Sequence, residues 1–130
     1  MPMISHATVS AQPSTRSGVP IRRLVAVEHG ATQTEAWEQV LPPGAEIPLH
    51  YHDVEETVVF LGGQIEAVIG EETTVTAAPV TAFVPATILH SFRNVGDVPA
   101  QMIVFFPALQ PAVIYLDGER RYAKGSQHEE

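Results

Sequence analysis

The feature that most limits the fold of this chain is a succession of short apolar runs separated by proline and glycine. From Ile21 onward these runs are rich in Val, Ile, Thr and Phe, residue types that favour extended backbone. Helical periodicity is weak throughout, and the best helical candidate, residues 32–41, lacks an N-terminal capping pattern and ends at Pro42. The sequence therefore predicts an all-β fold, a closed or double-sheet antiparallel β-barrel.

The punctuation also divides the chain into expected strands and flanking segments. The expected strands span residues 22–27, 35–41, 47–51, 56–61, 64–69, 72–77, 81–84, 90–94, 101–106 and 112–116. Residues 1–20, rich in Ser, Thr, Pro and Gly, predict a flexible N-terminal arm or a segment ordered only by a partner. Residues 21–117 predict one barrel domain, and residues 118–130 predict a polar C-terminal tail.

Charge and cysteine content narrow the function. The chain has 15 Asp+Glu against 7 Lys+Arg, a net charge of −8 with His neutral, and no basic run that would hold a phosphate backbone or an anionic lipid. It has no cysteine, which excludes disulfides, thiolate nucleophiles and Cys-type metal sites. No stretch approaches the roughly 20 apolar residues of a transmembrane helix, and residues 1–20 contain no apolar run of signal-peptide length. We therefore expect a cytoplasmic protein that binds a small molecule and neither nucleic acid nor membrane.

Two histidines on one expected strand form the first candidate for chemistry. A strand alternates faces with period two, so His50 and His52 point the same way and lie close enough to share a metal ion. The pair alone is weak evidence, because the chain contains six histidines. A hairpin turn then leads to a strand that opens with a carboxylate, which strengthens the metal interpretation.

That carboxylate is assigned to Glu56 by face alternation. Glu56 shares its face with Val58 and Phe60, and a carboxylate on an apolar face is costly unless it is paired or binds a metal. Glu55 faces the other way and is expected to be solvated, the reverse assignment of the two being the alternative.

A third histidine opens a later strand. A turn at Pro85 leads into His90, and Phe92 and Asn94 follow on the same face. Alone, His90 would more often be a structural histidine than a ligand. Together with the first hairpin, it supplies the third nitrogen of a stable metal site.

These segments resemble the two signature motifs of the cupin superfamily over roughly residues 35–107. Every fixed position of the first motif matches within GAEIPLHYHDVEETVVFLGG, namely Gly44, His50, His52, Glu56 and Gly63. In the second motif Pro85, His90 and Asn94 match, while Pro79 and Thr87 replace two glycines. Because Thr is β-branched and resists positive φ, we expect the turn before His90 to differ from the usual one, and Pro79 to alter only a surface turn.

The resemblance implies a small single-domain cupin, a jelly roll or double-stranded β-helix, with one divalent metal ion. It implies that the ligands are His50, His52, Glu56 and His90, and that Asn94 is structural. Three imidazoles and one carboxylate suit Fe, Mn, Ni, Zn or Cu and leave open positions for a ligand. If substrate displaces Glu56 from the metal, its carboxylate becomes a general base, which makes Glu56 the candidate catalytic residue.

Open positions on a redox-capable ion favour a dioxygenase-type oxidoreductase acting on a small organic molecule. The alternatives are a non-oxidative isomerase, lyase or cyclase, and a non-catalytic small-molecule-binding protein. Four apolar or aromatic residues are expected to line the substrate pocket, or else simply to fill the core: Val58, Phe60, Phe92 and Trp37. The predicted inner faces of the motif strands carry no arginine, which favours a neutral or weakly acidic, aromatic or enol-like substrate, although Arg22 and Arg23 could reach the barrel mouth.

Two runs, residues 57–61 and 102–106, are apolar on both faces. One face of an antiparallel sheet normally meets water, so these runs indicate a second layer outside the barrel wall. A homodimer partner would supply that layer, the alternative being ordinary sandwich packing within one chain.

Overall fold

The computed structural model describes residues 3–14 and 16–121. The described strands are β1 (Ala11–Gln12), β2 (Ile21–Val25), β3 (Glu35–Leu41), β4 (Glu46–Tyr51), β5 (Glu56–Phe60), β6 (Gln64–Ile69), β7 (Glu72–Ala77), β8 (Val80–Val84), β9 (His90–Asn94), β10 (Ala100–Phe106), β11 (Val113–Tyr115) and β12 (Arg120–Arg121). Two 3-10 helices, His6–Thr8 and Val27–His29, lie in the N-terminal part.

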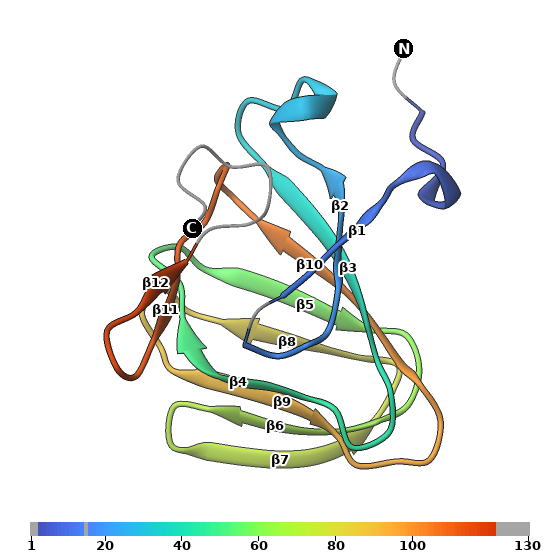
Figure 1. The fold of residues 1–130 in the computed structure, drawn as a ribbon. Helices are drawn as coiled ribbons and strands as arrows, with labels where there is room; N and C mark the ends of the chain where they lie inside the picture. Colours follow the sequence, from blue (N-terminus) through green and yellow to red (C-terminus); the bar gives the residue numbers. More distant parts are fainter. Residues whose placement is uncertain (1–2, 15, 122–130) are drawn as a thin grey trace.

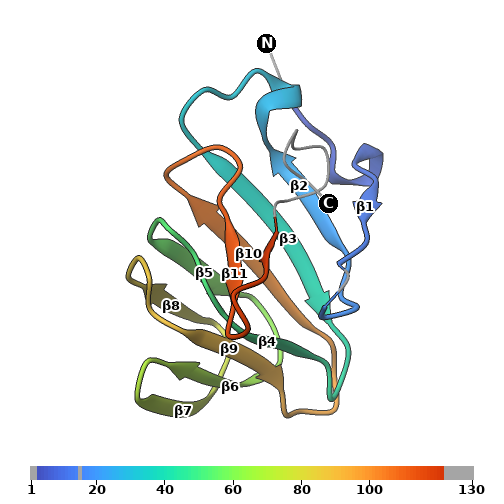
Figure 2. The ribbon, with the colours of Figure 1, turned by 60° about the vertical axis from the view of Figure 1, so that its left-hand side comes forward.

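The strands form two six-stranded antiparallel sheets (Figure 1). Sheet A has the order β1-β2-β3-β10-β5-β8, and sheet B has the order β12-β11-β4-β9-β6-β7. Strands that follow one another in the chain often lie in different sheets, as β3 and β4 do (Figure 2). This is the jelly-roll arrangement, and it brings the end of β4 and the starts of β5 and β9 together from both sheets.

The strand predictions are confirmed. The strands at 35–41, 64–69, 72–77 and 90–94 begin and end where expected, and the other expected strands agree within two residues at each end. Within residues 1–20, β1 pairs with β2 and Val19 is buried in the core at 3% exposure. The division into arm, barrel and tail stays a prediction, and residues 122–130 of the expected tail lie outside the described part of the chain.

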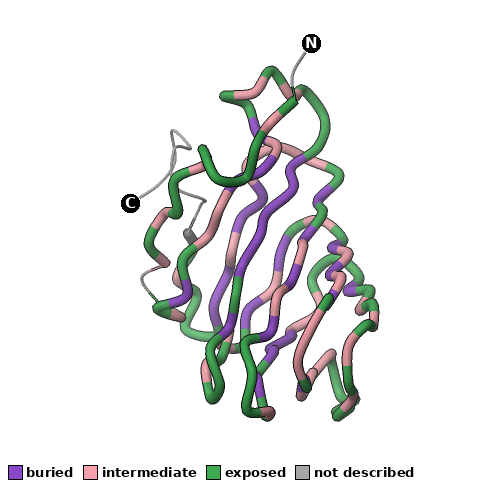
Figure 3. The backbone as a smooth tube through the Cα atoms, turned by 90° about the vertical axis from the view of Figure 1, so that its right-hand side faces the viewer, coloured by how far each residue is buried: buried purple, intermediate pink, exposed green. Residues whose placement is uncertain are grey.

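The core lies between the inner faces of the two sheets. Within sheet A, Met102 pairs with Phe60 and Val104 pairs with Val58, so all four side chains point inward. Phe92 of sheet B meets Phe60 edge to face, with ring centroids 5.3 Å apart. Figure 3 shows the buried stretches running along the middle strands, while the loops are mostly exposed. The packed interior holds the strand ends rigidly where the histidines lie.

Two motif glycines are required by the backbone. Gly44 has φ +82° and Gly63 has φ +90°, both in the left-handed region that residues with a Cβ atom rarely adopt. A Cβ atom on Gly63 would also lie 2.8 Å from the Cβ of Ala100. The turns at the two ends of the first motif therefore depend on glycine for their shape.

In the part of the chain that the structure describes, no helix is long and apolar enough to cross a bilayer. The cytoplasmic location stays a prediction.

Candidate metal centre

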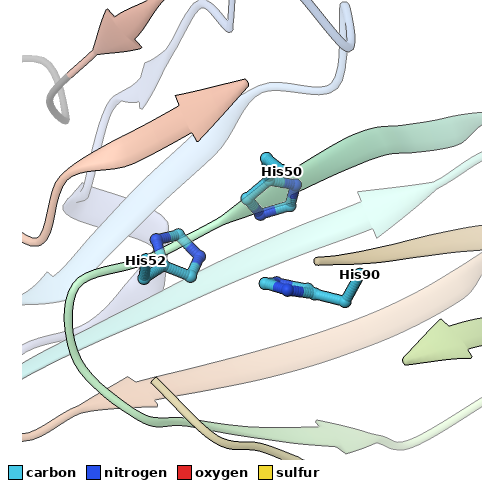
Figure 4. A group of neighbouring side chains, drawn as sticks. All are labelled: His50, His52 and His90. Carbon is cyan, nitrogen blue, oxygen red and sulfur yellow. The ribbon is translucent and has the colours of Figure 1, made fainter. Parts of the chain in front are cut away.

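Three histidines converge at one end of the barrel (Figure 4). His50 lies in β4, His52 follows the end of that strand, and His90 opens β9, directly opposite His50 in the β4–β9 pairing. The ring centroids are 4.2 Å apart for His50–His90, 4.8 Å for His50–His52 and 5.3 Å for His52–His90. One ring nitrogen of each histidine lies within 4.8 Å of the other two. The structure thus brings together the three histidines that the sequence singles out.

Each ring is oriented by a backbone carbonyl. The Nδ1 atoms of His50, His52 and His90 lie 2.7, 2.8 and 2.9 Å from the carbonyl oxygens of Pro48, Ala112 and Ile88, in that order. A carbonyl only accepts hydrogen bonds, so each Nδ1 is the protonated donor. The Nε2 atoms are left to act as ligands, an arrangement typical of metal-bound histidines.

Glu56, from the facing sheet, lies beside two of the three histidines. One of its carboxylate oxygens lies 2.9 Å from Nε2 of His90, and the other lies 3.5 Å from Nε2 of His52. Glu56 is 5% exposed and Glu55 is exposed, as face alternation predicts. The inner position follows from β5, in which alternate residues are buried.

Buried atoms without hydrogen-bond partners test whether these residues fit a metal ion. Nε2 of His52, Nε2 of His90 and Oε1 of Glu56 are buried and have no hydrogen-bond partner among residues 3–14 and 16–121. The 2.9 Å between His90 and Glu56 is short enough for a hydrogen bond, but the alignment is not suitable for one. Buried polar atoms are normally satisfied, so three such atoms beside one another fit a cation that accepts all three as ligands.

The electrostatics of the cluster differ between its members. Burial, together with the neighbouring His90 and His52, lowers the pKa of His50 to about 3, so that this imidazole is neutral at physiological pH. Burial, the largest single influence, would lower the pKa of His52, but the Glu56 carboxylate, the Ala112 carbonyl and Asp53 together outweigh burial and raise it. Burial alone would raise the pKa of Glu56, yet His52 and His90 hold it well below its usual range. Glu56 is therefore ionised beside two imidazoles.

These shifts predict proton release when a metal ion binds. Because the pKa of His52 is raised in the metal-free protein, this imidazole is protonated to a larger extent near neutral pH than a free one, and it must lose that proton to become a ligand. We expect titration calorimetry with Zn(II), in buffers of different ionisation enthalpy, to show protons released on metal binding, and more of them as the pH is lowered toward about 6. Because protons compete with the metal, the apparent affinity should fall as the pH is lowered. Proton release unchanged in a His52→Ala variant would contradict this assignment.

The turn before His90 corrects one expectation. Thr87 has φ +68°, so it adopts the left-handed conformation that a glycine would take more easily, and the expectation that threonine avoids positive φ at this turn is wrong. The turn is held because the Thr87 N–H donates to the carbonyl of His52 at 2.8 Å. The same hydrogen bond connects the turn to the histidine cluster, which consists of His50, His52 and His90. Pro79 is exposed in the turn between β7 and β8, as expected.

The four expected pocket residues lie in two environments. Phe60 borders a cavity of about 210 Å³ between the two sheets at their β7 and β8 edges. Val58 and Phe92 are fully buried members of the core. Trp37 packs on Phe106, with ring centroids 4.7 Å apart, and its Nε1–H donates to Glu35 at 2.9 Å.

Phe106, on which Trp37 packs, also contacts the histidine cluster, because its ring centroid lies 4.9 Å from that of His52. The roles of Val58, Phe60, Phe92 and Trp37 toward a substrate stay predictions.

Sequence reasoning missed the C-terminal wall of the cluster. Besides receiving the bond from His52, Ala112 donates its N–H to Asp53 at 3.3 Å, and Tyr115 lies beside His50 with ring centroids 6.1 Å apart. No local pattern signals these contacts, because Ala112 and His52 are 60 residues apart in the sequence.

The structure also decides where the two early arginines lie. Arg23 is 3% exposed and pairs with Glu35 and Glu28, at 3.1 Å in each case. Arg22, the preceding residue in β2, pairs with Glu38 of β3 at 3.5 Å. Its side chain lies on the outer face of sheet A, opposite to that of Arg23. Both guanidinium groups are thus paired with carboxylates of sheet A and of the segment after β2.

The chain is similar to known proteins in its sequence and in its fold. Residues 37–106 match the family model described as cupin domain. The polyketide synthase CurC of Streptomyces cyaneus is 32% identical over 102 residues, which span 77% of this chain and 66% of CurC. The solved structure of the polyketide cyclase RemF from Streptomyces resistomycificus superposes with a TM-score of 0.74 at 20% identity, over 89% of this chain and 87% of RemF. A structure of oxalate oxidase gives a TM-score of 0.73 at 23% identity, over 88% of this chain and 63% of the oxidase.

Proposed function

The chain belongs to the cupin domain family, and from that premise we propose that it is a metal-dependent enzyme that cyclises a small, largely apolar, enolisable molecule without oxidation. One divalent metal ion is held by His50, His52, His90 and Glu56. The observation that carries the proposal is the convergence of three histidines, each anchored through Nδ1, with a buried ionised carboxylate beside two of their free Nε2 atoms. The kinship with CurC and the fold shared with RemF support the cyclase-type reaction.

The reaction follows from the donor set. A bound divalent ion supplies Lewis-acid polarisation of a substrate carbonyl. Glu56, once the substrate displaces it from the ion, would accept a proton from the carbon between two carbonyls, and the resulting enolate carbon would bond to another carbonyl carbon of the same molecule. The oxygen of that second carbonyl would take up the proton held by Glu56, and the hydroxyl so formed would leave as water with a second proton from the former enolate carbon. The low pKa of Glu56 keeps the carboxylate ionised before that step. His50, neutral through burial, remains a ligand throughout.

The cavity between the sheets supports an apolar substrate. Its walls are mostly apolar side chains, and the polar lining consists of Glu72, Thr74 and Thr76 of β7 and Thr81 of β8. Among the described residues that line it there is no Lys or Arg. None of the four candidate ligands is among the residues that line the cavity, but Ile69, which lines it, is the cross-strand partner of His90. A molecule with its oxygen atoms at the metal and its hydrocarbon part in this cavity fits that arrangement.

A dioxygenase acting on a similar substrate is the second candidate. Three imidazoles and one carboxylate also suit Fe(II), Ni(II) and Cu(II), ions that support oxygen chemistry. The fold shared with oxalate oxidase is the observation that favours it. The two candidates differ in whether the reaction consumes oxygen and whether it needs a redox-active ion.

The test is a panel of aromatic polyketone and 1,3-diketone substrates, assayed with Zn(II), Mn(II), Fe(II), Ni(II) and Cu(II) under argon and under air. We expect turnover with Zn(II) under argon, a product that has lost water but gained no oxygen, and no oxygen uptake. Turnover confined to Fe(II), Ni(II) or Cu(II) with stoichiometric oxygen uptake would replace the cyclase with the dioxygenase. A bound ligand that is never converted would leave a binding protein.

We also propose that the protein is a homodimer formed through the outer face of sheet A. Phe105, Thr57 and Phe83 lie opposite one another on adjacent strands of that face, and the two phenylalanines are 47% and 54% exposed. Aromatic side chains on an open sheet face are typical of an interface.

We expect light scattering to give twice the 14.1 kDa chain mass for the wild type. A Phe105→Glu variant should give the single chain mass, because a charge would be buried unpaired in the interface. The control is Val75→Glu on the exposed edge strand β7, where Val75 is 64% exposed. A monomeric wild type, or a dimeric Phe105→Glu variant, would contradict the interface.

A further inference from the structure

A short C-terminal segment, outside the residues 37–106 that match the cupin family model, packs against one side of the histidine cluster. Residues 111–119 contain Ala112, whose carbonyl orients His52, and Tyr115, which pairs with His50 across β11 and β4. The β11–β4 ladder has only two residue pairs, and Figure 1 shows the β11–β12 hairpin at the outer edge of sheet B. So short a ladder contributes little by itself, and because Pro111, Ala112, Ile114 and Tyr115 are buried, the position of the segment depends mainly on side-chain contacts.

A contact from the opposite sheet holds this hairpin. Arg16 lies in the connection between β1 and β2 of sheet A, about one hundred positions earlier in the sequence. Its guanidinium donates to Asp117 at 2.6 Å and to Glu119 at 2.7 Å. Its Cζ also stands 4.3 Å from the centroid of the Tyr115 ring. Arg16 thus joins the β1–β2 connection of sheet A to Tyr115, whose ring lies beside that of His50.

The strength of these contacts suits a reversible closure. The side chains of Arg16, Asp117 and Glu119 are 34%, 60% and 32% exposed, and ion pairs so exposed to water are individually weak and screened by salt. The stacking of a guanidinium on an aromatic ring adds a second weak attraction. A buried pair would fix the hairpin permanently, whereas this one can open.

We propose that Arg16 is the positioning residue of a clasp, formed with Tyr115, Asp117 and Glu119, that holds residues 111–119 over His50 and His52. The clasp sets how fast a metal ion or a ligand reaches and leaves the site. This inference rests on the metal site proposed above. When Arg16 releases the hairpin, Tyr115 moves away from His50 and the Ala112 carbonyl loosens its hold on His52.

The first test measures release of metal. Zn(II)-loaded wild type and Arg16→Ala are mixed with an excess of a colorimetric chelator at low and at high salt. We expect release from Arg16→Ala to be about threefold to fivefold faster at low salt, the change that weak exposed contacts of this kind support. Salt should speed release from the wild type and leave the variant unchanged, and Arg16→Lys, which keeps the charge, should lie between the two.

The matched control is Arg93→Ala. Arg93 pairs with Glu66 at 3.1 Å on the outer face of sheet B, and the two side chains are 48% and 31% exposed. This pair resembles the Arg16 pairs but lies away from the hairpin, so its loss should leave metal release and its salt dependence as in the wild type. Equal release rates for wild type and Arg16→Ala, or the same salt effect in both, would overturn the clasp.

The second test needs no metal. We expect hydrogen–deuterium exchange at the amides of Ala112 and Tyr115 to be faster in metal-free Arg16→Ala than in the wild type and in Arg93→Ala, because the hairpin opens more often. Unchanged exchange at both amides would overturn the clasp even if the metal site is real. A wild type that binds no metal but shows this difference would refute the metal site and keep the clasp as a hairpin closure.

Discussion

Replacing His90 with alanine is expected to abolish metal binding and the stabilisation that metal confers. His90 is fully buried and contributes the Nε2 atom that lies 2.9 Å from Glu56. Without it, two imidazoles and one carboxylate remain, and the contact between the His50 and His90 rings, whose centroids are 4.2 Å apart, is lost. In the wild type, a metal ion at about 100 times its dissociation constant should add about 2.7 kcal/mol to the free energy of unfolding. In the variant this increment should be close to zero.

The measurement is thermal unfolding of each protein with and without Zn(II), together with metal analysis after dialysis. Comparing each protein with itself separates loss of the ligand from the cavity that alanine leaves in the core, which lowers stability with or without metal. His6→Ala is the control, because His6 is exposed in the N-terminal 3-10 helix. An equal metal-induced shift in wild type and His90→Ala would show that His90 is an ordinary core residue.

Replacing Glu56 with glutamine should lower the turnover number by a hundredfold or more. The substitution keeps the shape of the side chain but removes the charge and the basic oxygen, and a positioned general base typically contributes about 10²–10⁴-fold. Glutamine cannot accept the substrate proton, while the three histidines keep their Nδ1 anchors to Pro48, Ala112 and Ile88. We therefore expect a variant that still binds metal, with lower affinity, and barely turns over.

Glu55→Gln is the matched control for this experiment. Glu55 is the neighbouring residue and is exposed, so the same change of charge there should leave turnover near the wild-type value. The comparison is made at saturating metal, so that weaker binding of the ion does not lower the measured rate. Wild-type turnover in Glu56→Gln, or equal losses in both variants, would exclude Glu56 as the base.

Most of the strands, and the inner position of Glu56, could be predicted from local sequence patterns. Alternation of polar and apolar residues placed Glu56, Val58 and Phe60 on the inner face of β5, and the structure has them there. The same periodicity, with Pro and Gly between the runs, marked the strands that form the barrel. These features were predictable because a strand's two faces and its ends depend on residues within a few positions of one another.

The position of His52 shows where local pattern stops. Face alternation placed it beside His50, but β4 ends at Tyr51, and the ring is oriented by the carbonyl of Ala112, 60 residues later. The turn at Thr87 is a similar case, since a β-branched residue predicts negative φ, and the hydrogen bond to the carbonyl of His52 holds it at +68°. In both cases a distant backbone group outweighed the local preference.

By itself, the sequence determined the strands and their inner faces, because both depend on short-range periodicity, and the resemblance of its two motifs to those of the cupins identified the three histidines and one carboxylate that meet. Only the tertiary structure decided which ring nitrogens are free, which carbonyls orient them, and that Tyr115, with Arg16 stacked on it, lies beside His50. The carbonyls of Pro48 and Ile88 are two residues from the rings that they orient, but the contact between His52 and Ala112 joins residues 60 positions apart, and those of Tyr115 with His50 and Arg16 span still more of the chain. Strands that cross between two sheets bring these residues together, and no pattern within a strand records it.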